Sequence, residues 1–291
     1  MRLLLTPGDN VATLWIMANV LKRDKRVAVI SLLLEGNSVR STERLTGVHR
    51  DTILRLMLRV GAGCAEFSNQ TLRNLDCERI EVDEIWAFVA KKSKNVTESD
   101  DWSRIGDQYT FVALDPRTKL IPSYKVGKCT AYTTMEFIND LESRVRGRIQ
   151  ISSDGFQPYY HAIASAFGRG NVDYAMIVKE YAETAAGRGR YSPPKVISCE
   201  KEELIGSPDM KLVSTSMVER SNLSIRTHCR RLTRLSLGFS KKLENFKASM
   251  DLYFAYYNFV RFHRTISCTP AMEAGIMRSA LTVADLVDMA A

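Results

Sequence analysis

The sequence lacks the features that would assign it to several specialised classes of protein. Its six cysteines are scattered, and the closest pair, Cys64 and Cys77, is too widely spaced for a CxxC zinc or redox motif. No apolar run is long enough to span a bilayer. The opening MRLLLTPGDN reaches Pro7 and Gly8 too early for a signal peptide. We therefore expect a cytoplasmic protein with reduced cysteines and no membrane partner.

Histidine clusters, internal repeats and low-complexity tracts are also absent. The four histidines lie in different predicted elements, which argues against a histidine metal site. The chain has 291 residues, of which 45% are hydrophobic and 25% charged. These values are typical of a globular protein with one large domain or two smaller ones.

Positive charge is concentrated in one part of the chain. The formal net charge is +8, and the segment from Arg220 to Arg264 holds ten lysines and arginines against two acids, Glu244 and Asp251. Such a concentration indicates a polyanionic partner, for which we favour nucleic acid. A solvated basic helix face or a membrane-surface patch would show the same composition.

The N-terminal part of the sequence predicts a small helical unit. Residues 1–25 form an apolar helical segment, and residues 26–63 form three short helices separated near Gly36 and Gly47. A tight turn before the third helix resembles a helix-turn-helix, although any three-helix bundle shows similar spacing. The third helix would end before Gly61 and turn outward the DNA-binding candidates Arg50, Thr52, Arg55 and Arg59.

The remainder of the chain predicts a mixed α/β fold. Residues 64–79 are expected to be a linker, and residues 80–178 alternate strand and helix signals that give a five-stranded mixed sheet flanked by helices. Residues 179–213 are rich in glycine and proline and are interpreted as a loop-rich insertion. Two helices follow, and the aromatic stripe of the second is expected in the core. We place a catalytic domain at residues 80–275 and a C-terminal tail at residues 276–291.

Three acidic residues occupy positions suited to phosphoryl-transfer chemistry. Asp83 lies within the strand-like run IEVDEIWAFVA, Asp154 ends RIQISSD, and Glu219 opens a helix. A carboxylate among bulky apolar residues is costly unless a cation compensates it, and a few carboxylates suffice to hold Mg²⁺. Asp154 could instead cap the following helix, and Glu219 could be an ordinary exposed acid. Glu84 is a weaker candidate, because it points to the opposite face of a regular strand.

With these residues in place, the chain resembles transposases of the insertion-sequence-1 type, within the DDE group. The resemblance rests on VDEIWAFV, ISSDGFQPY, STSMVERSNLSIRTHCRRLTR and the tail FAYYNFVRFHRTISCTPAMEAG. It implies an RNase H-like catalytic domain, in which Asp83, Asp154 and Glu219 bind two Mg²⁺ ions, or Mn²⁺ in their place. Many members begin with a four-cysteine zinc ribbon, whose spacing this chain lacks.

The resemblance also implies the reaction and its partners. The enzyme would cleave the ends of a transposable element and join the resulting 3′-hydroxyl to target DNA. Arg226, two helical turns after Glu219, would contact DNA, and the helix-turn-helix would recognise the terminal inverted repeats. We also expect Arg230 and Arg231 to bind DNA, and the protein to form at least a homodimer there.

Two other functions fit parts of the same pattern. A stand-alone nuclease of the RNase H-like fold would use the same carboxylates, and strand joining would separate it from a transposase. A non-catalytic, sequence-specific DNA-binding protein, such as a repressor or a domesticated transposase, would need the helix-turn-helix alone.

Overall fold

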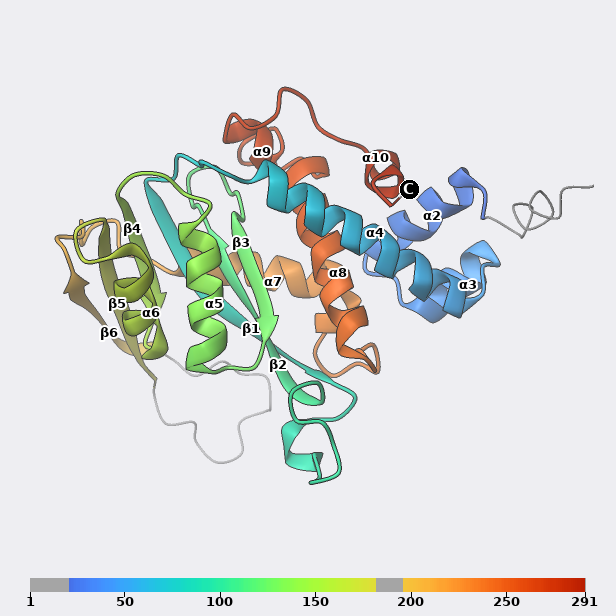
Figure 1. Ribbon diagram of the computed structural model, residues 1–291, viewed down its shortest axis with the longest axis horizontal. Helices are drawn as coiled ribbons and strands as arrows, with labels where there is room; N and C mark the ends of the chain where they lie inside the picture. Colours follow the sequence, from blue (N-terminus) through green and yellow to red (C-terminus); the bar gives the residue numbers. More distant parts are fainter. Residues whose placement is uncertain (1–20, 182–195, 291) are drawn as a thin grey trace, which may run out of the picture.

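The computed structural model describes residues 21–181 and 196–290, which form a sheet with helices on both faces (Figure 1). Almost all of the helical segment predicted at residues 1–25 lies outside this part of the chain. The strands are β1 (Arg79–Val89), β2 (Gly106–Leu114), β3 (Ser123–Gly127), β4 (Ile149–Asp154), β5 (Val172–Tyr181) and β6 (Val196–Ile205).

The sheet is mixed, with the order β3-β2-β1-β4-β5-β6. Strands β1, β2 and β3 form an antiparallel meander, whereas β4 pairs in parallel with both β1 and β5. This arrangement of the first five strands is the RNase H-like one that was predicted. Strand β1 is therefore central. Its first three residues pair in parallel with β4, and this pairing brings the residues of β1 that follow them close to the end of β4.

The predicted five-strand count is wrong, because the described part of the sheet has a sixth strand. Strand β6 pairs antiparallel with β5 and lies within residues 179–213, which we predicted to be loop-rich. Its sequence VISCEKEELI is largely exposed and charged, so it has no apolar alternation to mark it as a strand. Backbone hydrogen bonds along the edge of β5, rather than core burial, hold it in place.

The side chains of β1 alternate between two cores. Ile80 and Val82 are fully buried on the face covered by α5 (Ala131–Glu142) and α6 (Pro158–Phe167). Ile85 and Ala87 are buried on the other face, against α7 (Ser216–His228) and α8 (Leu243–Ala255). The aromatic stripe of α8 is buried there, as predicted. None of the described helices is long and apolar enough to cross a membrane.

Three helices precede the sheet: α2 (Arg23–Leu34), α3 (Val39–Thr46) and α4 (Arg50–Thr71). Ser38 caps α3 by accepting a hydrogen bond from the Ser41 N–H, and Gly47 ends it with φ +69°. The predicted end of the third helix before Gly61 is wrong, and residues 64–71 are helix rather than linker. Gly61 is instead a packing position, because a Cβ there would lie 2.6 Å from the Ala248 carbonyl oxygen on α8.

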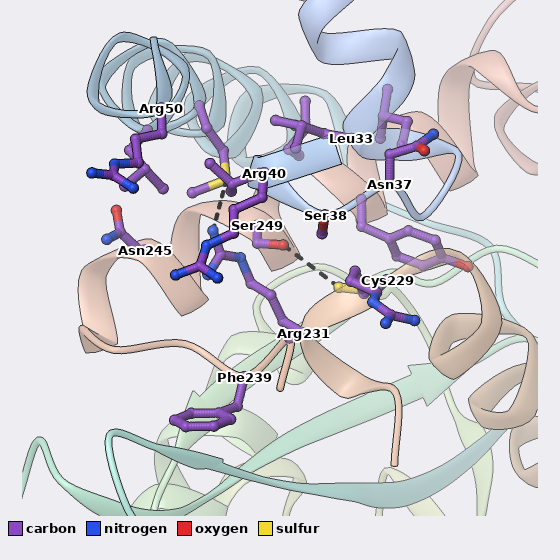
Figure 2. A pocket seen from close by; sticks show the side chains of 18 of the residues that line it. Leu33, Asn37, Ser38, Arg40, Arg50, Cys229, Arg231, Phe239, Asn245 and Ser249 are labelled. Carbon is purple, nitrogen blue, oxygen red and sulfur yellow. Dashed lines mark hydrogen bonds between the residues drawn. The ribbon is translucent and has the colours of Figure 1, made fainter. Parts of the chain in front are cut away.

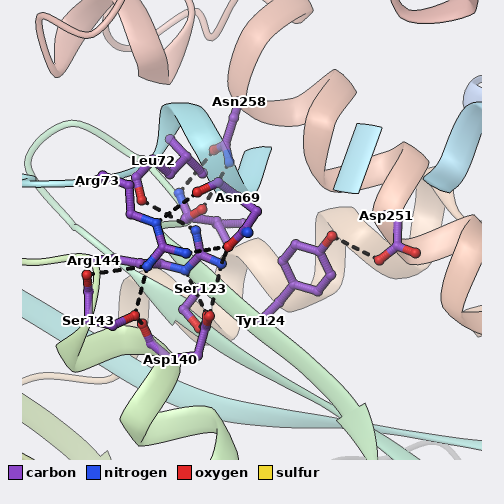
Figure 3. Close-up of polar contacts among 11 residues, drawn as sticks. Asn69, Leu72, Arg73, Ser123, Tyr124, Asp140, Ser143, Arg144, Asp251 and Asn258 are labelled. Atoms are coloured by element: carbon purple, nitrogen blue, oxygen red, sulfur yellow. Dashed lines mark hydrogen bonds and ion pairs between the residues drawn. The ribbon is translucent and has the colours of Figure 1, made fainter. Parts of the chain in front are cut away.

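Polar contacts fasten the end of α4 to the end of α5 (Figure 3). Arg144, which is 9% exposed, binds Asp140 on α5 and donates to the Leu72 carbonyl and the Asn69 side chain. Asn258 donates to the Ile121 carbonyl and accepts from its N–H. Asn258 lies in the π-helical turn Tyr256–Val260, after α8. The N-terminal helices and the sheet therefore share one packed core. The chain ends with α9 (Pro270–Glu273) and α10 (Val283–Asp288).

Candidate functional site

Three carboxylates meet where β1 and β4 separate. Asp83, Glu84 and Asp154 each offer an oxygen that lies within 4.8 Å of the other two. The parallel pairing of β1 with β4 covers only Arg79–Glu81, so Asp83 and Glu84 lie two and three residues beyond the last paired residue. Asp154 is the final residue of β4 and continues to pair with Ile177 of β5. Strand pairing thus brings together the two aspartates that the sequence predicted.

Glu84 belongs to this cluster even though it points to the opposite face from Asp83. Asp83 faces α7, where Asn222 Nδ2 donates to its Oδ2 at 2.7 Å. Glu84 faces α6 and lies beside the fully buried Tyr159. The carboxylate of Asp154, the last residue of β4, lies within 4.8 Å of both. Alternation along β1 was therefore predicted correctly, but it did not remove Glu84 from the site.

Asp154 does not cap α6, which was the alternative interpretation of its position. The N-cap of α6 is Gln157, and it makes no side-chain capping bond. Asp154 Oδ1 instead accepts the Phe156 N–H at 3.1 Å, which closes a tight turn after the strand. One carboxylate oxygen is thereby held by the backbone, which orients the side chain toward β1.

Glu219 lies in the first turn of α7, close to the cluster but outside it. Its charge raises the pKa of both Asp83 and Asp154, although burial has the larger effect on each. Glu219 Oε1 accepts a hydrogen bond from Thr215 at 2.7 Å and forms an ion pair with Lys179 of β5. The third predicted carboxylate is thus in electrostatic contact with the other two, and a lysine neutralises it.

Glu81 positions α7, a role that the sequence did not indicate. Its side chain is 1% exposed, and Oε2 accepts the backbone N–H groups of Met217 at 2.9 Å and Val218 at 3.0 Å. These are first-turn donors of α7, which have no partner within the helix. Glu81 and Asp83 share one face of β1, so this contact holds Glu219 opposite Asp83. The only feature of the sequence that indicated this role was the spacing of two residues between Glu81 and Asp83, which places both side chains on the same face of a strand.

The cluster is electrostatically unfavourable without a cation. Burial raises the pKa of Asp83 to about 6 and that of Glu84 to about 8. Burial also raises the pKa of Asp154. The backbone N–H of Glu84 and the Asn222 amide oppose the shift at Asp83, but neighbouring carboxylates add to it. Oxygen donors at this spacing fit a hard divalent cation such as Mg²⁺ or Mn²⁺, whose charge would reverse these shifts.

Arg226 does not present a free guanidinium to solvent. It is half-buried, and Nη1 donates to the carbonyls of Trp86 and Leu232, both at 3.2 Å. Burial lowers its pKa to about 10, with a smaller lowering from Arg234. Arg226 therefore ties α7 to β1 and to the 3-10 turn η2 (Arg230–Leu232), and its contact with DNA remains a prediction.

The other predicted DNA-binding residues fall into two groups. Arg50, Arg55 and Arg59 are exposed on α4, and Thr52 beside them is half-buried and accepts a bond from Arg55 at 3.3 Å. Arg230 is exposed in η2, whereas its neighbour Arg231 is partly buried and donates to Ser240 Oγ at 2.9 Å. The first group lies on the helices that precede the sheet, and the second beside the end of α7.

Comparisons with known proteins give only a distant likeness. No family model matches the chain, and no curated protein matches it. Among solved structures it is similar to the Mos1 transposase paired-end complex with left transposon end, at 14% identity and a TM-score of 0.23, over 54% of this chain and 60% of that chain. The Mos1 strand transfer complex matches at 15% identity and a TM-score of 0.23, over 54% and 59%. The chain thus covers about 60% of the length of the structures it matches, and a likeness this weak supports no functional conclusion.

Proposed function

We propose that the protein is a DNA transposase that cleaves transposon ends with divalent metal ions and joins the 3′-hydroxyl to target DNA. The observation that carries this proposal is the approach of Asp83, Glu84 and Asp154 within 4.8 Å, from two adjacent strands. Clustered, half-buried carboxylates raise the free energy of the folded protein unless a cation binds. The carboxylates lie where the central strands β1 and β4 separate, and a bound cation would offset their mutual repulsion there.

Three residues would hold the metal ions in the proposed site, and a fourth would orient one of them. Asp83 and Asp154 would hold the metal ions, and Asn222 would orient Asp83 through its 2.7 Å hydrogen bond. Bound Mg²⁺ or Mn²⁺ would activate the attacking oxygen and stabilise the leaving oxygen of a phosphodiester. Glu219 would serve as the third ligand after exchanging its ion pair with Lys179 for a metal contact.

The proposal divides the chain between recognition and chemistry. Residues 26–63 would act as a helix-turn-helix that recognises terminal inverted repeats, and residues 80–275 would perform catalysis. The exposed arginines of α4 support this division. Because α4 packs directly on α8, the recognition surface and the carboxylates would move as one body. Two transposon ends would require at least a dimer on DNA.

Cleavage assays test the proposal on a duplex that carries the sequences flanking the coding region. We expect nicking that depends on Mg²⁺ or Mn²⁺, and joining of the new 3′ end to a second duplex. Asp83→Asn should abolish both reactions and leave DNA binding largely intact. Glu78→Gln is the matched control, because Glu78 is exposed just before β1 and its side chain makes no hydrogen bond or ion pair with the described residues. Full metal-dependent cleavage by Asp83→Asn would contradict the assignment, and nicking without joining would indicate a nuclease.

One observation favours a second candidate, a sequence-specific DNA-binding protein without cleavage activity. The ion pair between Lys179 and Glu219 occupies the third carboxylate, as expected of a site that no longer takes metal. Calorimetric titration with Mn²⁺ separates the two candidates. Mn²⁺ binding that is lost in Asp154→Asn supports the transposase, whereas DNA binding without any Mn²⁺ binding supports the repressor-like protein.

A further inference from the structure

A cleft of about 550 Å³ lies between the N-terminal helices and the far end of α7 and α8 (Figure 2). One wall comes from the turn between α2 and α3 and from the start of α4. The other wall comes from the end of α7, η2, the loop that follows it, and α8 from Asn245 to Tyr253. The cleft is separate from the carboxylate site, and neither wall contributes a predicted metal ligand.

The side chains that line the cleft are strongly biased in charge. None of its described lining residues is acidic, and five are basic: Arg40, Arg50, Arg230, Arg231 and Lys241. Arg40 and Arg50 line the cleft from the wall of the N-terminal helices, and Arg231 lines it from the opposite wall (Figure 2). Positive groups crowded into one concavity repel each other, and an anion relieves that repulsion. The cleft therefore has the electrostatic character of an anion site.

Arg231 is a partly buried cation that has no carboxylate partner among the described residues. Its Nη1 donates to Ser240 Oγ at 2.9 Å and its Nη2 to the Met57 sulfur at 3.4 Å. Burial lowers its pKa, which shows that the surroundings oppose its charge. By contrast, Arg144 and Arg148 each bind an aspartate. A guanidinium held by a hydroxyl and a thioether keeps donors for an incoming anion.

Asn245 gives an independent indication of a ligand. It lines the cleft beside Arg50 and is only 8% exposed, yet its Oδ1 has no hydrogen-bond partner among the described residues. Buried amides are normally satisfied, and the oxygen and nitrogen of an asparagine are assigned from the contacts they make. With the amide turned, Nδ2 would be the unpartnered atom, and rotation of the side chain into the cleft would let it donate to an anionic oxygen.

One wall of the cleft packs against the end of α7, and the other is joined to β1. Gly36, in the turn between α2 and α3, packs so closely that a Cβ there would lie 3.1 Å from the Thr227 carbonyl at the end of α7. Ser240, which accepts the bond from Arg231, forms a bridge with Val89 at the end of β1. An anion bound in the cleft is thus held at a fixed position relative to the strand that carries Asp83.

We propose that this cleft binds the phosphodiester backbone of duplex DNA and fixes it between the N-terminal helices and the catalytic sheet. The inference rests on the proposed function, because it takes the polyanion to be DNA. Arg40, Arg231 and Lys241 contact phosphate oxygens, and Asn245 donates one further bond. These contacts carry no sequence information and set the register of the duplex. Arg55 and Arg59 are further exposed cations on α4, the helix that carries Arg50.

Fluorescence anisotropy of the full chain with a mixed-sequence DNA duplex, measured across a KCl series, tests the proposal. Arg40→Gln/Lys241→Gln removes two exposed charges from the cleft, and Lys211→Gln/Arg278→Gln removes two exposed charges elsewhere. We expect the cleft variant to lose roughly tenfold in affinity per contact. The log–log salt slope should fall by about two, because each phosphate contact contributes about 0.9. Asn245→Ala, which removes no charge, should weaken binding without changing the slope.

Three outcomes decide the matter. Equal affinity and equal slope in the cleft and control variants would overturn the proposal. A second outcome would also overturn it: inorganic phosphate stabilises the wild-type protein against heat, and the cleft variant loses this stabilisation but keeps its DNA affinity. The cleft would then bind a free anion and not DNA. Weaker DNA binding by the cleft variant supports the proposal even if the wild-type protein never cleaves DNA, in which case the transposase function fails and the cleft stands.

Discussion

Asn222 of α7 donates a 2.7 Å hydrogen bond to Asp83 of β1, across 139 positions of sequence. The bond joins the helix that carries Glu219 to the strand that carries two of the three clustered carboxylates. A carboxylate shielded from water loses hydration, and a single amide donor compensates only part of that loss. The contact therefore orients Asp83 and leaves it in need of further positive charge.

The stability of the metal-free protein should fall as pH rises from about 4 to 8. The pKa of Asp83 is about 6 and that of Glu84 about 8, above ordinary values of 3.8 and 4.5. The folded protein keeps these protons after the unfolded chain has lost them, so stability is greatest below both ordinary values and declines through pH 6 and then pH 8. Urea unfolding in EDTA across this range measures the slope. Glu84→Gln should flatten the decline above pH 6, and an unchanged decline would contradict this account.

Glu81→Ala should destabilise the protein by at least about 1.5 kcal/mol, because two buried N–H groups lose a charged acceptor. Glu81→Gln should cost much less, since both bonds reach the same oxygen and a glutamine oxygen can replace it. Chemical denaturation compares these variants with Glu78→Gln. If Glu81→Ala and Glu78→Gln unfold at the same urea concentration, the capping role of Glu81 is wrong.

Lys179→Gln should tighten Mn²⁺ binding several-fold at pH 8, because Glu219 would no longer be neutralised by an ammonium group. Below pH 6 this increase in Mn²⁺ affinity should be smaller. Lys179 also lowers the pKa of Asp154, so in Lys179→Gln the Asp154 carboxyl keeps its proton to higher pH and competes with the metal. Isothermal titration at both pH values checks the difference. Weaker Mn²⁺ binding at pH 8 would show that Lys179 supports the metal site.

Gly61→Ala should destabilise the protein, because the added methyl would lie 2.6 Å from the Ala248 carbonyl oxygen and the backbone cannot yield cheaply. Such overpacking costs about 1–3 kcal/mol, against a helix-propensity gain of about 1 kcal/mol. Gly170→Ala is the control, since no atom lies within 4 Å of its would-be Cβ. A thermal midpoint for Gly61→Ala at or above that of Gly170→Ala would refute the close packing of α4 on α8.

Local sequence patterns were sufficient where burial is periodic. The apolar runs around Asp83 and Asp154 predicted β1 and β4, and the aromatic stripe of α8 predicted its buried face. Strand alternation also placed Asp83 and Glu84 on opposite faces. These inferences succeeded because a side chain's face depends only on the repeat of its own helix or strand.

Contacts between distant segments decided the rest. Strand β6 forms by pairing with the free edge of β5. Helix α4 continues past Gly61 because the glycine allows close packing against α8. Glu84 belongs to the cluster because β4 ends beside β1. Glu81 and Lys179 act on α7 from strands far away in the chain. Periodicity reports which way a residue faces, but which partner it meets depends on strand order and helix packing. The carboxylates suited to metal binding could thus be predicted from the sequence, whereas the charged groups that surround them were identified only from the tertiary structure.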